Sequence, residues 1–242
     1  MKSFQQEIQD IKSKILRREY FSLARYGDGE MMIMKGESID LLGKANGEFK
    51  YDPSSKKDEE YREKLLKAFR YCREGYFIGI GCPCCVGNSN FQWMKRHSRQ
   101  DEASLTWANL LVNGNYKTFL TEIVPLFSEM DVYIVCNSKA TLERLSFKEN
   151  IVKDWRVTAD AWKGDDTILS DFEVLSPKGS LFLFAAGPYS KILCHQMWSR
   201  NQQNFYIDIG STMDPWLFGP NGYTRGYLRG APTLNKICIW GN

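Results

Sequence analysis

The sequence has no marked excess of either charge and no basic block. Its 242 residues include 32 lysines and arginines and 29 aspartates and glutamates, for a net charge of +3. Domains that bind nucleic acids usually carry a concentrated basic patch or stripe. We therefore expect no nucleic acid among the partners of this protein.

Long hydrophobic runs are also missing. The most apolar stretch, SLFLFAAG at residues 180–187, is far shorter than the roughly 20 apolar residues of a membrane-spanning helix. The N-terminal segment MKSFQQEIQDIKSKIL is charged and lacks the apolar core of a signal peptide. We expect a cytoplasmic protein without a transmembrane segment.

The cysteine and histidine patterns do not predict a metal site. Seven cysteines are an odd number in a chain too long to need disulfides, which favours reduced thiols and a cytoplasmic location. The GCPCC segment at residues 81–85 could form a metal site with Cys72, but no second cysteine pair stands at zinc-site spacing. We interpret these cysteines as small buried side chains beside a strand. His97 and His195 are not spaced as a ligand pair, and we expect His195 to pack or cap within a helix.

What the sequence does contain is an alternation of predicted helices and strands. The spacing of Phe4, Ile8, Ile11 and Ile15 predicts an amphipathic helix over residues 4–18. Other helices are predicted over residues 58–72, 139–145, 164–175 and 188–200, and a pair over 104–127 that breaks at Asn113-Gly114, with Asn115 able to cap its second member. Apolar strands are predicted over residues 20–26, 76–81, 131–138, 154–159, 179–187 and 204–211.

Apolar strands separated by helices imply a parallel sheet that is covered on both faces. The predicted fold is a single α/β, Rossmann-like domain over residues 1–242, with a mostly parallel sheet and helices on both faces. It begins with the helix within residues 1–18 and ends with a loop and tail over residues 212–242. The first helix carries lysines and could contact a membrane peripherally, but we expect its apolar face to pack on the sheet.

In such folds, ligands bind in the crevice beyond the carboxyl ends of the strands. Five predicted strands end in the segments RYGDGE, GIGCPCC, CNSK, AAGPYSK and DIGSTMDP. Most of these segments combine glycine with polar or charged side chains. We therefore expect the ligand site among them.

The first of these segments places Asp28 and Glu30 two residues apart. On extended backbone the two carboxylates would point the same way and would repel each other unless a cation or a shared proton joins them. A hard divalent cation such as Mn²⁺ or Mg²⁺, held by carboxylates and substrate phosphates, would meet this need. The alternative is structural: Asp28 caps the helix GEMMIMK, and Glu30 is an acidic residue of its first turn.

A second segment, AAGPYSKIL, could hold an anion. Gly187 permits close approach of a ligand to the backbone, and a helix that starts at Pro188 would offer N–H groups. Lys191 in the first turn opposes the helix dipole, a conflict that a bound phosphate would remove. The alternative is a solvated lysine. In either case we expect Lys191→Ala to leave the stability unchanged or slightly raised.

The C-terminal segment adds further candidates. Asp208 ends a strand, Asp214 precedes a proline, and Arg225, Tyr227 and Arg229 follow in a glycine-rich stretch. Arginine suits forked contacts with phosphate, and tyrosine stacks on a base or sugar. The alternative is a wrapping segment whose aromatic side chains pack on the core.

Taken in order, FSLARYGDGE, AAGPYSKIL and IDIGS followed by DP resemble the GT-D-type glycosyltransferases, whose domain was long one of unknown function. The resemblance runs from about residue 20 to residue 230, and R-x-G-D-G-E is its most specific part. It implies a Rossmann-like fold, a D-x-E metal motif at Asp28-Gly29-Glu30 and a nucleotide-sugar donor, typically UDP-linked. Ser211 stands where many members have a histidine, so the donor and acceptor stay unspecified.

Together, the resemblance and the residue patterns predict a metal-dependent glycosyltransferase with a glycan, glycolipid or glycoprotein acceptor. Asp28 and Glu30 would hold Mn²⁺ or Mg²⁺. The residues expected to contact the donor are Arg25, Gly27, Gly187, Lys191, Arg225 and Tyr227. The nominated general base is Asp214, and Asp160, Asp165 and Asp208 compete with it. Two alternatives stay open: an S-adenosylmethionine-dependent methyltransferase, suggested by YIDIGS, and a non-catalytic nucleotide-sugar-binding protein of the same fold.

Overall fold

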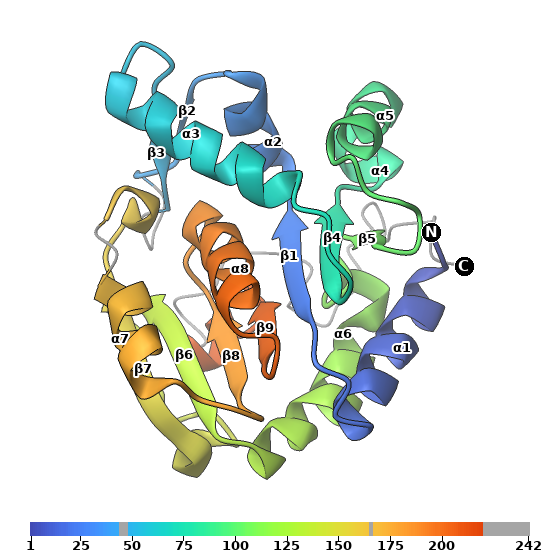
Figure 1. Cartoon of the computed structure of the whole chain (residues 1–242), viewed down its shortest axis with the longest axis vertical. Helices are drawn as coiled ribbons and strands as arrows, with labels where there is room; N and C mark the ends of the chain where they lie inside the picture. The colour runs from blue at the N-terminus through green and yellow to red at the C-terminus, as the bar shows by residue number, and fades with distance from the viewer. Residues whose placement is uncertain (44–47, 165–166, 220–242) are drawn as a thin grey trace.

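The computed structural model describes residues 1–43, 48–164 and 167–219 (Figure 1). Its centre is a seven-stranded sheet in the order β5-β4-β1-β9-β8-β6-β7, and all neighbouring strands in it pair in parallel. The strands are β1 (Ser22–Tyr26), β4 (Tyr76–Ile80), β5 (Leu105–Trp107), β6 (Val132–Asn137), β7 (Ile151–Val157), β8 (Leu181–Phe184) and β9 (Phe205–Asp208). A separate antiparallel pair joins β2 (Ile39–Asp40) to β3 (Lys50–Tyr51).

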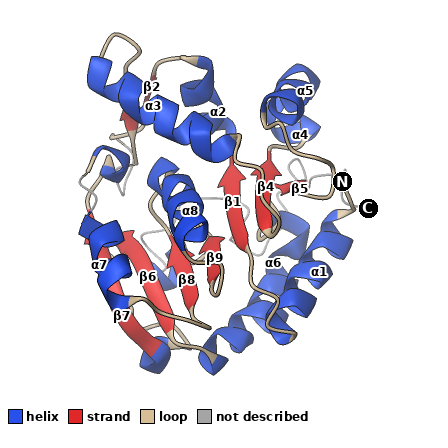
Figure 2. Cartoon of the chain, viewed as in Figure 1, coloured by secondary structure: helices blue, strands red, loops and turns tan. Residues whose placement is uncertain are grey.

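Helices cover the sheet on both faces (Figure 2). They are α1 (Phe4–Leu16), α2 (Asp28–Lys35), α3 (Lys56–Phe69), α4 (Pro83–Val86), α5 (Asn88–His97), α6 (Tyr116–Thr118), α7 (Thr167–Leu175), α8 (Pro188–Arg200) and α9 (Asp214–Leu217). Helical turns of other types continue α6 through residues 119–129. The predicted α/β, Rossmann-like class is confirmed.

Strand β8 shows why the sheet is buried on both sides. Leu181 and Leu183 belong to one hydrophobic core, together with α1 and the helical segment over residues 116–129. Phe182 and Phe184 belong to a second core, together with α2, α3, α7 and α8. All four side chains are inaccessible to solvent. Because alternate residues of a strand face opposite sides, a run of four apolar residues requires two covering layers.

The first helix confirms its prediction. A capping box starts it, in which Gln6 N–H donates to Ser3 Oγ and Ser3 N–H donates to the Gln6 side chain. Its four apolar residues, Phe4, Ile8, Ile11 and Ile15, are buried in the first core. The apolar face of α1 is therefore used for packing. None of the helices in the described part of the chain combines the length and apolar character needed to cross a bilayer.

Two predicted helices are wrong. Residues 105–107 form β5 instead, because they pair with β4 and all three side chains are buried. Asn115 is at the N-cap position of α6, as predicted, but its side chain makes no capping hydrogen bond; its amide donates to the carbonyl oxygens of Phe4 and Leu110. Residues 139–145 form turns and irregular backbone, and the Asn137 side chain accepts the N–H of Lys139 at their start.

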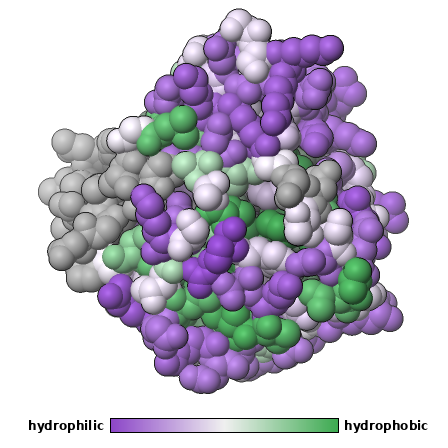
Figure 3. All heavy atoms as spheres, turned by 90° about the vertical axis from the view of Figure 1, so that its left-hand side faces the viewer, coloured by the Kyte–Doolittle hydropathy of each residue, from purple (hydrophilic) through white to green (hydrophobic). Residues whose placement is uncertain are grey.

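The face shown in Figure 3 is mostly hydrophilic, with apolar side chains gathered in a few patches. Near the free edge of the sheet at β7, Val152 is 55% exposed, and on α7 Val174 is 86% and Leu175 44% exposed. Strand β7 also carries the charged residues Lys153, Asp154 and Arg156, and charge is a common protection of an edge strand against unwanted pairing.

His195 packs in the second core, as predicted. It is 6% exposed and meets the ring of Tyr71 edge-on, with centroids 4.6 Å apart. Burial, assisted by the charges of Lys67 and Arg200, lowers its pKa to about 4. The folded protein therefore keeps His195 neutral at pH values where the unfolded chain binds a proton.

This burial predicts an acid-sensitive contribution to stability. As pH falls from about 7 to 5, the unfolded state gains a proton at His195 and the folded state does not, so wild type should lose about 1–2 kcal/mol that His195→Leu does not lose. Urea unfolding of both proteins across this range measures the difference, with His97→Leu as the control for removing an imidazole. Parallel pH profiles for wild type and His195→Leu would contradict the prediction.

Candidate active site at the carboxyl edge of the sheet

The five predicted strand ends meet at one edge of the sheet. They follow β4, β1, β9, β8 and β6, which are consecutive neighbours and parallel. From β1 the chain continues through β4 to β5 on one side, and then crosses to β6 on the other side of β1 and β9. The order of strands thus reverses between β1 and β9, which is where open α/β sheets form their ligand crevice.

A buried ion cluster lies at this reversal. Lys191 Nζ is 2.7 Å from Glu30 Oε1 and 3.0 Å from Asp208 Oδ2, and it donates to the carbonyl oxygen of Gly187 at 3.0 Å. Lys191 is 4%, Glu30 8% and Asp208 0% exposed. The three acceptors match the three donors of an ammonium group. We call Arg25, Glu30, Lys191 and Asp208 the Lys191 cluster.

Arg25 joins the cluster from the end of β1. Its backbone N–H donates to Asp208 Oδ2 at 3.1 Å, its Nε donates to the Asp208 carbonyl at 2.6 Å, and its Nη1 donates to the Ala108 carbonyl at 3.1 Å. The other oxygen of Asp208, Oδ1, accepts the N–H of Gly210 at 3.0 Å. Asp208 therefore ties the ends of β1 and β9 together.

The pKa values follow from this pairing. Burial alone would raise the pKa of Glu30, but the charge and hydrogen bond of Lys191, together with the backbone N–H groups of Glu30 and Gly27, hold it below its ordinary value. Burial alone would lower the pKa of Lys191, but the carboxylates of Asp208 and Glu30 hold it above its ordinary value. Lys191 and Glu30 are therefore both charged at neutral pH.

Asp28 and Glu30 do not point the same way, because they lie in the first turn of α2 and not on extended backbone. The N-cap of α2 is Gly27, whose N–H donates to Glu30 Oε2 at 3.0 Å. Glu30 thus has the structural role of a first-turn acid, while Asp28 is not the cap. Asp28 is exposed at the edge, and its Oδ1 accepts the N–H of Gly29.

In this arrangement Asp28 is better suited than Glu30 to bind a divalent cation. Both Glu30 oxygens accept hydrogen bonds, and one lies against an ammonium that would repel a metal. The Lys191 cluster has two positive and two negative groups, and Asp28 adds an exposed carboxylate beside it. An exposed carboxylate can bind a hard divalent cation whose remaining coordination positions are filled by substrate phosphates and water.

The start of α8 differs from the expected anion cradle. Pro188 has no N–H, and the N–H groups of Tyr189 and Ser190 donate to the carbonyls of Ala186 and Gly187. Lys191 is not a solvated side chain, since two carboxylates and a carbonyl surround its ammonium. The conflict between Lys191 and the helix dipole is therefore resolved inside the protein. Gly187 adopts φ +56°, which favours glycine.

The nominated bases lie in different settings. Asp214 is half-buried and begins α9 on the loop after β9, and Ser211 precedes it on the same loop. Asp160 accepts hydrogen bonds from Lys50 N–H and Trp162 Nε1 and pairs with Lys163, so it has a structural role. Asp165, Arg225, Tyr227 and Arg229 lie outside the residues that the structure describes.

Gly210 next to the cluster predicts a sensitive position. Its φ is +50°, and a Cβ there would lie 2.7 Å from Arg25 Nη2. Gly210→Ala should therefore lower the free energy of unfolding by about 1–3 kcal/mol. Gly114→Ala is the matched control, because nothing lies within 4 Å of its Cβ position. Equal stability of the two variants in urea unfolding would contradict the close packing of Arg25 on Gly210.

The cysteine interpretation is partly wrong. Cys82 is buried, but Cys84 and Cys85 are exposed on the α4 turn at the end of β4. Cys72 lies before β4, at the opposite end of the strand, where its thiol donates to the carbonyls of Arg70 and Arg99. Cys72 is therefore not part of the group formed by the GCPCC cysteines.

A hollow of about 1160 Å³ lies at the opposite, amino end of the strands. Residues of α1 line it, together with the segments that precede β4 and β5. Its charged side chains include both signs, among them Lys14, Glu19 and Arg73. Ligands of this fold bind at the carboxyl ends of the strands, and the hollow lies at the other end. We therefore place the candidate site at the carboxyl edge.

The pairing of Lys191 with Glu30 and Asp208 was missed by sequence reasoning, although all three residues were singled out. One signal was available: a lysine in the first turn of a helix with apolar residues on both sides of it, Tyr189 before it and Ile192 and Leu193 after it. A buried lysine needs acidic partners, and the other strand ends supply them.

Comparison with known proteins supports the fold. No family model and no curated protein match the sequence. A solved glycosyltransferase of the DUF1792 type from Streptococcus sanguinis is 14% identical, with a TM-score of 0.60 over 85% of this chain and 80% of that one. Another structure, of the highly conserved domain of unknown function 1792 with a distinct glycosyltransferase fold, is 16% identical, with a TM-score of 0.57 over 85% and 78%. The protein has the fold of these structures.

Proposed function

We propose that this protein is a glycosyltransferase that moves a sugar from a nucleotide-sugar donor to a glycan, glycolipid or glycoprotein acceptor. The observation that carries the proposal is the exposed Asp28 at the strand reversal, in a fold shared with a solved glycosyltransferase. The sequence segment RYGDGE, which resembles the GT-D-type family, forms this same part of the site.

In this proposal Asp28 holds a divalent cation, Mn²⁺ or Mg²⁺, together with the donor diphosphate. When bound, the cation would act as a Lewis acid for the charge that develops on the leaving diphosphate. Glu30 contributes indirectly, because its bonds to Gly27 N–H and Lys191 fix the turn that presents Asp28. Lys191 and Arg25 act in the same way, as positioning residues.

The donor would approach the backbone at Gly27 and Gly187, which are both partly exposed, beside the Phe49 ring that lies against Gly187. Gly27 precedes α2 and Gly187 precedes α8, so a diphosphate between them would lie near the positive ends of two helix dipoles. Arg225 and Tyr227 stay candidates for the diphosphate and for the base or sugar. A UDP-linked donor is the first choice on the family resemblance.

Asp214 is the proposed general base for the acceptor hydroxyl. Asp214 is half-buried at the start of α9, in the segment that follows β9, and β9 is one of the two strands at the reversal. Asp208 is less suited to proton transfer, because it is fully buried and accepts bonds from Arg25, Lys191 and Gly210.

The methyltransferase alternative loses its main support. It depended on YIDIGS as a strand and loop for a nucleoside cofactor, but β9 is the last strand among the described residues and Asp208 is paired within the Lys191 cluster. A carboxylate in this position is not presented to a ribose hydroxyl. A non-catalytic nucleotide-sugar-binding protein is distinguished from an enzyme by turnover alone.

A thermal-shift screen separates these functions. UDP-sugars, GDP-sugars, CMP-sialic acid and S-adenosylmethionine would each be added with Mn²⁺ or with EDTA. We expect a nucleotide sugar to raise the melting temperature more with Mn²⁺ than with EDTA. With Mn²⁺ and the ligand at a hundredfold excess over its Kd, binding should stabilise the protein by about 2.7 kcal/mol. A shift by S-adenosylmethionine alone would overturn the proposal.

A further inference from the structure

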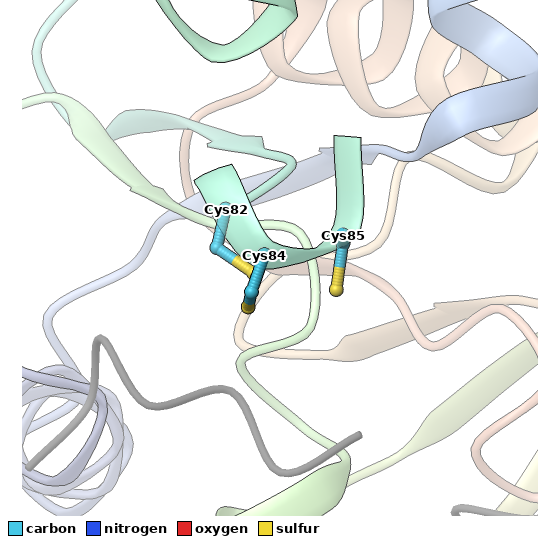
Figure 4. Close-up of side chains that lie close together, drawn as sticks. All are labelled: Cys82, Cys84 and Cys85. Atoms are coloured by element: carbon cyan, nitrogen blue, oxygen red, sulfur yellow. The ribbon is translucent and has the colours of Figure 1, made fainter. Parts of the chain in front are cut away.

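Three thiols gather at the carboxyl end of β4, outside the Lys191 cluster. The Sγ atoms of Cys82, Cys84 and Cys85 all lie within 4.8 Å of one another, and those of Cys82 and Cys84 are 3.0 Å apart. Figure 4 shows that the three side chains come from one turn and direct their sulfur atoms to the same side of it. We call these residues the thiol triad.

The turn that carries the triad is firmly built. The N–H groups of Cys85 and Val86 both donate to the carbonyl of Cys82, at 2.9 Å and 3.1 Å. Pro83 at the first helical position fixes its own φ. A Cβ at Gly81 would lie 2.5 Å from Val86 Cγ1, so the turn presses against the strand end. The thiols are therefore positioned by the backbone before any ligand binds.

The spacing and exposure of the triad suit a metal ion. Zinc binds thiolate at about 2.3 Å, and a tetrahedral angle then separates the sulfur atoms by about 3.8 Å. The spacing of the triad, from 3.0 Å to at most 4.8 Å, brackets this value. Cys82 is buried and Cys84 and Cys85 are exposed, so an ion could enter from solvent. The Asn109 amide lies 3.9 Å from Cys82 Sγ and donates to it, as partners of metal ligands do.

We propose that the thiol triad binds a thiophilic divalent metal ion of the zinc class through three thiolates, with the fourth position open to solvent. Each thiol releases its proton to solvent as it binds the metal, and no oxidation or reduction takes place. Thiolates select softer ions, whereas the carboxylate of Asp28 selects Mn²⁺ or Mg²⁺. The two sites would therefore hold different ions, and this proposal does not depend on the glycosyltransferase activity.

The test uses the reduced, metal-free full-length protein titrated with Cd²⁺, followed by displacement with Zn²⁺. We expect thiolate-to-metal charge-transfer absorption that saturates at one ion per chain and is lost when Zn²⁺ replaces Cd²⁺. Cys84→Ser and Cys85→Ser should each weaken binding at least tenfold. Cys72→Ser is the matched control, because it removes another exposed thiol at the opposite end of β4, and its binding should equal that of wild type.

Serine at the exposed positions 84 and 85 should not disturb folding, and equal melting temperatures in the absence of metal check this point. Absence of charge-transfer absorption in wild type would overturn the proposal. So would an unchanged affinity in the Cys84→Ser/Cys85→Ser double variant, or a loss of binding in Cys72→Ser.

Discussion

Replacing Lys191 by methionine should lower the free energy of unfolding by about 3–5 kcal/mol, because it leaves buried carboxylates without their counter-charge. The Glu30 carboxylate would keep the hydrogen bonds from Gly27 N–H and from its own N–H, but it would lose Lys191. Glu30 is only 8% exposed, so water could not replace the lost partner fully. Asp208 would keep the N–H groups of Arg25 and Gly210. Urea unfolding and the melting temperature measure the loss.

A surface pair provides the control for this variant. Lys12 Nζ lies 2.8 Å from Glu122 Oε2, but the two side chains are 31% and 38% exposed. Lys12→Met should therefore cost no more than about 1 kcal/mol. Adding Glu30→Gln to Lys191→Met should recover part of the loss, because it removes one uncompensated charge. A Lys191→Met protein as stable as Lys12→Met would contradict the buried cluster.

The pH dependence of the cluster has a defined sign. The pKa of Glu30 is lowered, so in wild type its contribution is present above the ordinary carboxyl pKa and lost as pH falls through the folded value. The pKa of Lys191 is raised, so its contribution persists up to the ordinary lysine pKa and is lost as pH rises through the folded value. In Lys191→Met, burial without the ammonium raises the Glu30 pKa, so the deficit should shrink on acidification.

Asp28→Asn should reduce sugar transfer by roughly 10²–10³-fold, the usual range for losing one electrostatic group at a reacting centre. Asp28 is exposed, so the substitution should leave the free energy of unfolding within about 0.5 kcal/mol of wild type. The dependence of donor binding on Mn²⁺ should weaken in parallel. Initial rates at varied Mn²⁺, with the melting temperature of the same samples, measure both effects.

Two carboxyl variants make the Asp28 result specific. Asp10→Asn removes a partly exposed carboxylate on α1 that pairs with Lys2, far in sequence from the candidate site, and should keep full activity. Glu30→Gln should lower the melting temperature, unlike Asp28→Asn, because Glu30 belongs to the buried cluster. If Asp28→Asn transfers sugar as fast as Asp10→Asn, the role assigned to Asp28 is wrong.

The sheet, and the edge at which the predicted strand ends meet, were predictable because their signals are local. Fully apolar strands such as Leu181–Phe184 specify burial on both faces, and parallel strands bring their carboxyl ends to one edge. Longer helices with apolar spacing, such as Phe4–Leu16, were also placed correctly. These features depend on periodicity and topology rules that a single sequence contains.

The wrong predictions for residues 105–107 and for Lys191 have a different cause. In both cases tertiary contacts determine the structure. The edge strand Leu105–Trp107 is too short to show a strand pattern, and pairing with β4 specifies it. The sequence predicted that Lys191→Ala leaves the stability unchanged or slightly raised, because only the dipole of its own helix was considered. Its partners come from β9 and from the turn after β1, which no local pattern connects to α8.

The release of nucleoside diphosphate from a panel of nucleotide sugars, with Mn²⁺ present, tests the proposed function most directly. Wild type should release the diphosphate from at least one donor, and faster when a glycan acceptor is added, while Asp28→Asn should release little above the protein-free blank. Lys191→Met serves to separate folding from chemistry, because its defect should appear first in the melting temperature. Wild-type protein that remains folded and releases no diphosphate from any donor, with or without acceptor, would contradict the account.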